Sequence, residues 1–276
     1  MTAAAAAPPS LRARALAIVL EADPAAKIAA ARALADGSAA PDPDERFAEP
    51  RGVPGRPLRP QLVAPAALAQ RPVHTREGRA ALFHALAHIE LNAVDLALDL
   101  VWRFAGMPQE FYRDWIGVAA EEATHFELLA AQMAELGAAY GDFPAHGALW
   151  EMAAATSGDL LARLALVPRT LEARGLDASP PIRAKLERAG DAAGARLLER
   201  ILRDEIGHVA LGNRWYRWLC AARAVDPHSA WRELVVRYNA PRLRGPFNLE
   251  ARRAAGFDEA ELALLVAADA ASARCR

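Results

Sequence analysis

Apolar residues recur every three or four positions over long stretches of the chain, and strand-like alternation is rare. This spacing is typical of amphipathic helices, and the abundance of Ala and Leu also favours helix. Clusters of glycine and proline separate the periodic stretches. We therefore predict an all-α fold with helices over residues 10–35, 75–104, 108–136, 148–174, 182–189, 191–223 and 258–272.

Proline placement refines this prediction. Pro168 should kink the helix over 148–174, and the run Gly175 to Pro181 should end it. Residues 38–72 contain eight prolines, which forbids a long helix there. Apolar residues between these prolines favour an extended strap that lies on the helices. Long irregular segments are often lids or binding loops, so the strap or the C-terminal tail from residue 224 is expected to roof a pocket that leads to the functional site.

Two Glu-x-x-His pairs carry the chemistry suggested by the sequence. They are Glu122 with His125 and Glu205 with His208. A glutamate precedes each pair at a similar distance: Glu90 lies 32 residues before Glu122, and Glu172 lies 33 residues before Glu205. This is the ligand inventory of a two-metal carboxylate site in a four-helix bundle.

The spacing has a physical reason. Residues three apart lie on one face of a helix, so the Glu and His of each pair can hold one ion together. Apolar residues flank Glu90, Glu122 and Glu205 on the same helix faces, which predicts that these carboxylates are buried. Glu172, with Pro168, Arg169 and Gly175 as neighbours, is a weaker case. Carboxylate and imidazole ligands suit iron or manganese.

These residues could also have roles that do not involve a metal ion. A single Glu-x-x-His pair is common in helices that bind no metal. Glu121 and Asp204 each lie four residues before a histidine and could orient its ring, or they could be solvated acids. His84 and His88 have a spacing that can bind metal but lie well away from Glu90 around the helix, which favours a capping or surface role.

Composition narrows the class of protein. The formal net charge is −1, so no overall field attracts nucleic acid, and nucleic acid is not an expected partner. The two cysteines lack metal-ligand spacing, which fits a reducing cytoplasm. The N-terminus does not have the pattern of a signal peptide. Because no run reaches the roughly 20 apolar residues that span a bilayer, no membrane association is expected.

The ligand motifs carry a resemblance to known proteins. The segments around Glu90, Glu121 to Phe126, Leu171 to Asp177, Asp204 to Val209 and Arg244 to Asn248 resemble an uncharacterised bacterial ferritin-like family, over about residues 10–265. The chain is more distantly similar to ferritin-like di-iron tRNA hydroxylases. The resemblance implies six metal ligands: Glu90, Glu122, His125, Glu172, Glu205 and His208. It implies no substrate.

These observations predict a ferritin-like four-helix bundle over residues 73–223. An N-terminal helix and strap (1–72) precede the bundle, and a C-terminal helical extension (224–276) packs on it. The predicted function is a di-iron carboxylate oxidoreductase that activates oxygen or peroxide. Its cofactors would be two iron ions, with manganese or a mixed pair as alternatives. Its substrate would be a small molecule or a modified nucleoside. The alternatives are a metal-handling protein of ferroxidase type and a bundle with structural metal.

Overall fold

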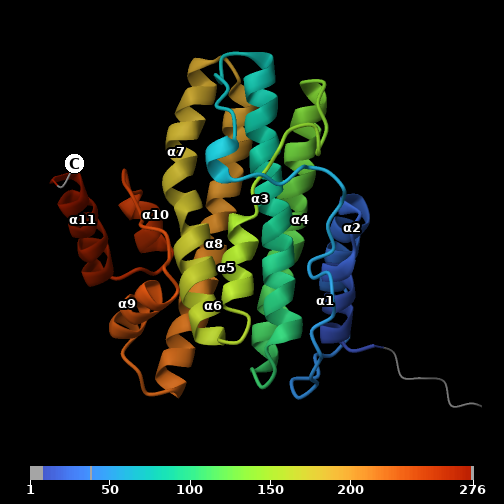
Figure 1. Cartoon of the computed structure of the whole chain (residues 1–276), viewed down its shortest axis with the longest axis vertical. Helices are drawn as coiled ribbons and strands as arrows, with labels where there is room; N and C mark the ends of the chain where they lie inside the picture. The colour runs from blue at the N-terminus through green and yellow to red at the C-terminus, as the bar shows by residue number, and fades with distance from the viewer. Residues whose placement is uncertain (1–8, 38, 275–276) are drawn as a thin grey trace, which may run out of the picture. The chain divides into compact units, whose positions relative to one another are not determined.

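The computed structural model describes residues 9–37 and 39–274, and their regular structure is helical (Figure 1). The α-helices are α1 (Leu11–Leu20), α2 (Pro24–Ala35), α3 (Arg76–Arg103), α4 (Gln109–Glu135), α5 (Ala148–Ala155), α6 (Leu160–Leu166), α7 (Ala173–Arg188), α8 (Ala192–Ala222), α9 (Pro227–Arg237), α10 (Leu249–Ala254) and α11 (Glu259–Arg274). Two shorter helical segments are η1 (Pro65–Ala67) and η2 (Val167–Glu172). The all-α prediction is confirmed.

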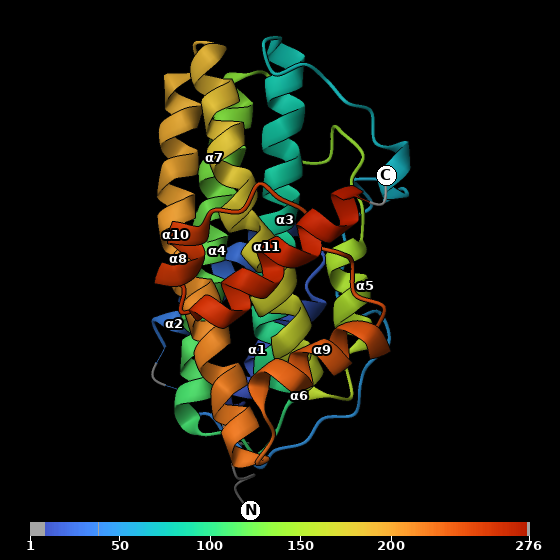
Figure 2. The same ribbon diagram turned by 90° about the vertical axis from the view of Figure 1, so that its left-hand side faces the viewer.

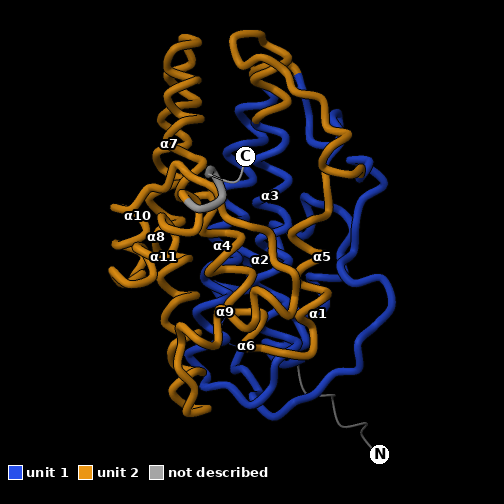
Figure 3. Tube along the Cα trace, turned by 60° about the vertical axis from the view of Figure 1, so that its left-hand side comes forward, with its two compact units in different colours: residues 1–62, 83–134, 138–145 blue, residues 63–82, 135–137, 146–276 orange. Residues whose placement is uncertain are grey.

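The chain forms two compact units (Figure 3). Unit 1 contains residues 1–62, 83–134 and 138–145, and unit 2 contains residues 63–82, 135–137 and 146–276. Helix α3 therefore starts in unit 2 and runs through unit 1. The three-part division at residues 72 and 223 stays a prediction.

Two helices form at the N-terminal end of unit 1, where the sequence pattern predicted one helix over 10–35. Helix α1 ends at Leu20, and α2 starts at Pro24. The side chain of Asp23 accepts a hydrogen bond from the backbone N–H of Ala26, and Pro24 occupies the first turn, where no N–H is needed. These local signals break a helix although the apolar pattern continues through the break, so the single-helix prediction was wrong.

The proline-rich strap is held against unit 1 by a buried arginine. The guanidinium of Arg12 donates hydrogen bonds to the backbone carbonyls of Val101 (2.9 Å) and Trp102 (2.8 Å) at the end of α3. It also donates to the carbonyl of Asp42 in the strap at 3.0 Å. The backbone N–H of Gly106 bonds to the carbonyl of Pro43 at 2.7 Å. One buried cation thus ties α1, the strap and α3 together, as the strap prediction required.

Helices α3 and α4 supply most of the apolar core of unit 1. Side chains at helical spacing are fully or almost fully buried on both helices, among them Phe83, Ala87, Val94, Leu98, Phe111, Trp115, Phe126 and Leu129. Burial of a large apolar side chain contributes roughly 1.5–3 kcal/mol to stability. The bounds of α3 and α4 lie within one residue of the predicted ranges.

Unit 2 is built around α8, which packs along α6, η2 and α7. The predicted helix over 148–174 is interrupted. Helix α5 ends at Ala155, and α6 starts at Leu160, with the carboxylate of Asp159 accepting from the N–H of Leu161 at 3.0 Å. The turn after α5 carries Gly158, which the pattern of apolar residues does not register.

The predicted break between Gly175 and Pro181 is also wrong, because α7 continues through Pro180 and Pro181 to Arg188. A proline removes the hydrogen bond to the carbonyl four residues earlier. For Pro180 that carbonyl belongs to Leu176, and it accepts a hydrogen bond from the side-chain amide of Asn248 at 3.3 Å. A residue 72 positions away therefore replaces the bond that the proline cannot make.

The C-terminal segment of unit 2 contains three helices, of which only α11 was predicted (Figure 2). Asp226 and Pro227 start α9, and Asn248 caps α10. Helix α10 contacts α7, α8 and α11. One apolar cluster joins these elements and contains Ala173, Leu176, Val209, Ala251, Ala255, Phe257 and Leu262.

Among the described residues, α3 is the single helix long and apolar enough to cross a membrane. However, 72% of its most apolar stretch is buried inside the protein. This degree of burial is typical of the core helix of a soluble protein.

Candidate metal centre

Unit 1 brings together three of the six predicted ligands. Glu90 projects from α3, and Glu122 and His125 project from one turn of α4. The Nδ1 atom of His125 lies 3.1 Å from Oε2 of Glu122 and 3.7 Å from Oε2 of Glu90. All three side chains are at most 5% exposed. The prediction that these residues point inward is confirmed, and we call them the unit 1 triad.

Burial and like charge shift the pKa values of the unit 1 triad. Burial raises the pKa of Glu90 to about 8, and the neighbouring carboxylate of Glu122 raises it as well. Burial alone would lower the pKa of His125, but its hydrogen bond to Glu122 and the nearby carboxylate of Glu90 outweigh burial and raise the pKa to about 11. Two carboxyl groups and one imidazolium thus crowd together in the protein interior, an arrangement that a bound cation would relieve.

The unit 1 triad fits a metal ion by ligand type and by distance. Each residue offers one ligand atom, and these atoms lie within 4.8 Å of one another. Oε2 of Glu90 is buried and has no hydrogen-bond partner among the described residues. A buried carboxylate oxygen without a donor is costly unless an ion or a proton occupies the space beside it. Carboxylate oxygen with imidazole nitrogen suits iron, manganese or zinc.

Unit 2 carries the second Glu-x-x-His pair on α8. Nδ1 of His208 lies 3.9 Å from Oε1 of Glu205, with exposed side-chain fractions of 3% and 13%. The same ring nitrogen faces the glutamate three residues earlier in both pairs. This similarity follows from the i, i+3 geometry of an α-helix, so α8 repeats the arrangement of Glu122 and His125.

Glu172 lies at the end of η2, a turn of π-helix between α6 and α7. The side chain is half-buried. The π-helical turn includes Pro168, so the predicted kink takes the form of a widened helical turn. It also packs closely on α8, since a Cβ atom added at Gly212 would lie 2.7 Å from Cβ of Pro168. Single π-helical turns often occur at functional sites.

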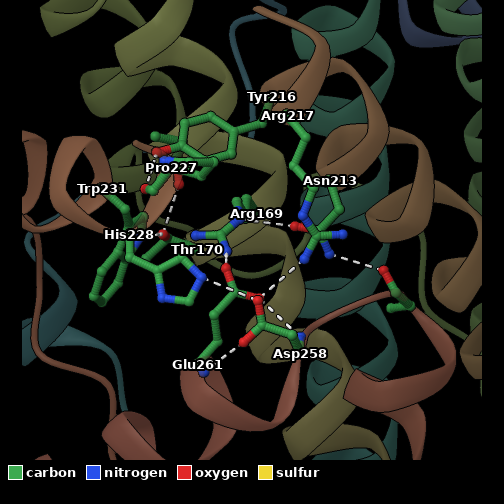
Figure 4. A network of polar contacts seen from close by, with 12 residues as sticks. Arg169, Thr170, Asn213, Tyr216, Arg217, Pro227, His228, Trp231, Asp258 and Glu261 are labelled. Atoms are coloured by element: carbon green, nitrogen blue, oxygen red, sulfur yellow. Dashed lines mark hydrogen bonds and ion pairs between the residues drawn. The ribbon is translucent and has the colours of Figure 1, made fainter. Parts of the chain in front are cut away.

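Arg169 of η2 lies at the centre of a network of polar contacts (Figure 4). Its side chain is almost completely buried, and Nε donates to Oδ1 of Asn213 on α8 at 2.8 Å. It also forms an ion pair with Glu261 of α11. The rings of Tyr216 and Phe257 lie 4.8 and 5.1 Å from its guanidinium. Burial lowers the pKa of Arg169 to about 10. The C-terminal helix thus holds the turn that carries Glu172.

Family comparison places the chain among proteins of unknown function. The family described as "Protein of unknown function (DUF455)" matches residues 20–263. The chain belongs to the DUF455 family. An uncharacterized protein of Haemophilus influenzae strain Rd is 48% identical over 213 residues, which cover 75% of this chain and 74% of that protein. No solved structure matches the chain. The resemblance to an uncharacterised family is therefore confirmed.

A second acidic cluster in this DUF455 protein was not predicted. His228, Asp258 and Glu261 offer ligand atoms within 4.8 Å of one another (Figure 4). However, both Arg169 and Arg217 form ion pairs with Glu261. Two guanidinium groups already neutralise that carboxylate, so a further cation would be repelled. The cluster is a structural ion-pair network.

The remaining sequence candidates have mixed outcomes. Glu121 is exposed and Asp204 is half-buried, and their role beside the histidines stays a prediction.

The capping or surface role favoured for His84 and His88 was wrong, because both are buried. Nε2 of His84 accepts from the N–H of Gly141 at 2.9 Å, and Nδ1 of His88 lies 2.8 Å from the hydroxyl of Tyr140. Both histidines face a loop that follows α4, and the helical pattern alone did not show this.

Proposed function

We propose that this DUF455 protein is a di-iron carboxylate oxidoreductase that activates oxygen or peroxide. The observation that carries the proposal is the unit 1 triad. Two buried carboxylates and one imidazole converge there, with one carboxylate oxygen left without a hydrogen-bond donor. Such a cluster is unfavourable in a metal-free protein, and its ligand types suit iron.

The repeated sequence pattern extends the proposal to a ferritin-like site with two ions. Glu172, Glu205 and His208 repeat the spacing of Glu90, Glu122 and His125. We infer that the two halves together hold two iron ions, or manganese in one or both positions. Bound iron would supply one-electron chemistry toward oxygen. The family likeness to di-iron tRNA hydroxylases supports the inference by analogy only.

The residues of the chain would contribute ligand geometry and protection from water. The i, i+3 pairs fix each histidine beside its glutamate, and the apolar core of α3 and α4 surrounds the unit 1 triad. When a metal ion replaces the shared proton, His125 must give up the proton that Glu122 and Glu90 now stabilise. Metal binding is therefore expected to release protons and to strengthen as pH rises.

The substrate class in this proposal is a small molecule or a modified nucleoside, with dioxygen as co-substrate. A cytoplasmic location belongs to the proposal too, because iron of this kind is loaded in its reduced form. The net charge of −1 gives no support for binding of an extended nucleic acid.

Oxygen consumption by the iron-loaded protein tests the proposal. The protein is reconstituted with ferrous ion, and oxygen uptake is followed with and without excess reductant. An oxidoreductase should consume oxygen repeatedly while reductant lasts. A single stoichiometric oxidation would instead indicate ferroxidase-type metal handling. No uptake would indicate structural metal and would refute the proposal. Glu135→Gln, on the exposed end of α4, is the matched control for Glu122→Gln.

A further inference from the structure

Unit 1 contains a small cavity beneath the proline-rich strap. Its volume is about 90 Å³, equal to roughly three water molecules at liquid density. Side chains from α2, the strap, α3 and the loop after α4 line it, and the polar ones are Lys27, Arg56, His88, Asn92, Asp95 and Tyr140. The strap thus lines a pocket, but none of the proposed metal ligands lines it, and the predicted access route to the metal site stays a prediction.

This cavity is separate from the unit 1 triad. The lining residues of α3 are His88, Asn92 and Asp95, with Leu91 between them. At 100° per residue, Glu90 points roughly 140–160° away from those three around the helix axis. The cavity therefore lies on the other face of α3 from the proposed metal ligands, and the inference below does not depend on the proposed di-iron chemistry.

A buried ion pair forms one wall of the cavity. Nζ of Lys27 lies 2.6 Å from Oδ1 of Asp95, and both side chains are at most 5% exposed. The ammonium also donates to the carbonyls of Val19 (3.3 Å) and Gly55 (3.0 Å), so all three of its protons are used. Lys27 therefore holds the strap and α1 in place and has no donor left for a ligand.

The side-chain oxygen of Asn92 accepts no hydrogen bond from the described part of the protein. The residue is 3% exposed. Its Nδ2 donates to the backbone carbonyl of His88 at 2.6 Å, which fixes which end of the amide is nitrogen. Its Oδ1 is buried without a hydrogen-bond partner. Leaving such an atom unpaired costs about 1–3 kcal/mol. A ligand with a hydrogen-bond donor would remove that cost.

Arg56 supplies a positive charge at the same cavity. Its side chain is half-buried, and it makes no ion pair within the described residues. Burial raises the pKa of Asp95 to about 6, and the charges of Lys27 and Arg56 oppose that rise. With Lys27 and Asp95 neutralising one another, Arg56 leaves the cavity with a net positive charge at neutral pH.

We propose that this cavity binds a small monocarboxylate that also carries a hydroxyl group, glycolate being the simplest example. The carboxylate pairs with the guanidinium of Arg56, a geometry that arginine favours. The hydroxyl donates to Oδ1 of Asn92. A cavity of about 90 Å³ suits a ligand of this size.

Ligand-observed NMR titrations of the full-length protein test this proposal. Glycolate should bind with one site per chain. Acetate lacks the donor for Asn92, and ethylene glycol lacks the charge for Arg56, so each should bind about tenfold more weakly or not at all. Equal binding of acetate and glycolate would overturn the role of Asn92. No binding of glycolate would mean that the cavity holds water only, and would overturn the proposal.

Two variants place the binding at this cavity. Arg56→Gln should weaken glycolate binding at least tenfold. Arg59→Gln, an exposed arginine of the same strap outside the cavity, should leave it unchanged. Arg59 is exposed and Arg56 is only half-buried, so neither substitution empties a fully buried position. Equal loss in both variants would show that glycolate responds only to the charge of the strap, and would contradict the proposed site.

Discussion

Single buried ionisable residues set the pH response expected of this protein. Glu90 and His125 share the unit 1 triad, while His84 is buried beside the loop after α4. Glu90 has a raised pKa and His84 a lowered one, so each prefers its neutral form in the folded state. Their contributions to stability therefore change with pH in opposite directions.

The first prediction concerns Glu90→Gln in the metal-free protein. The folded-state pKa of Glu90, about 8, lies above its ordinary value of 4.5. The folded state then binds the proton more tightly than the unfolded state, so stability falls as pH rises from about 4.5 to 8. Because Gln cannot ionise, the Glu90→Gln variant should not lose stability in this way as pH rises. Chemical denaturation at pH 5 and pH 9 measures the free energy of unfolding. Relative to the wild type, Glu90→Gln should be more stable at pH 9 than at pH 5.

Glu135→Gln, which replaces an exposed glutamate, is the control for this prediction and should follow the wild type at both pH values. Iron content provides a second readout, because Glu90→Gln should also bind less iron than Glu135→Gln. A metal-free Glu90→Gln that is less stable than the wild type at pH 9 would mean that this carboxylate holds the fold rather than an ion.

The second prediction concerns His84. Burial lowers the pKa of His84 from 6.5 to about 4. The unfolded state then binds the proton more tightly between these values, so this contribution to stability is full above pH 6.5 and is lost as pH falls toward 4. His84→Gln should therefore lose less stability than the wild type between pH 7 and 4.5, by on the order of 2 kcal/mol. His74→Gln, at an exposed position, should behave like the wild type.

At the scale of helices, distant residues hold α7 and η2 in forms that their own sequences do not favour. Asn248 replaces the hydrogen bond lost at Pro180. Glu261 and Asn213 hold Arg169 and with it the π-helical turn that ends in Glu172. The C-terminal helices of unit 2 therefore contribute to the position of a proposed metal ligand.

The third prediction tests that contribution with Glu261→Gln. Removing the carboxylate leaves Arg169 as a buried charge without its partner, which costs about 3–5 kcal/mol. Glu259→Gln is the matched control on the same helix. Its pair with Arg253 is exposed and screened by solvent, so its loss should cost far less stability. Thermal or denaturant unfolding of both variants measures the difference, and similar costs would show that Arg169 does not depend on Glu261.

The sequence was sufficient where structure depends on neighbours along the chain. Turn residues fixed the ends of α3, α4 and α8, and the i, i+3 rule placed His125 beside Glu122. The sequence was not sufficient to predict structure where the interacting residue lies far away along the chain. The ion pair of Arg169 joins residues 92 positions apart, and the hydrogen bond of Asn248 joins residues 72 positions apart. The cavity under the strap likewise combines four separate segments.

At the scale of the whole molecule, this all-α DUF455 protein carries the ligands of a proposed site with two metal ions. The two Glu-x-x-His pairs lie in different units, with Glu122 and His125 in unit 1 and Glu205 and His208 in unit 2. The proposal that both pairs act together rests on the repeated spacing with Glu90 and Glu172. It requires two ions per chain, whereas the unit 1 triad alone requires only one.

Metal stoichiometry tests this claim most directly. The full-length protein is loaded anaerobically with excess ferrous ion, freed of unbound metal and analysed for iron per chain. The account predicts two iron ions per chain, with reduced occupancy in both Glu122→Gln and Glu205→Gln and unchanged occupancy in Glu135→Gln. One ion per chain that depends on Glu122 and not on Glu205, or no bound iron, would contradict it.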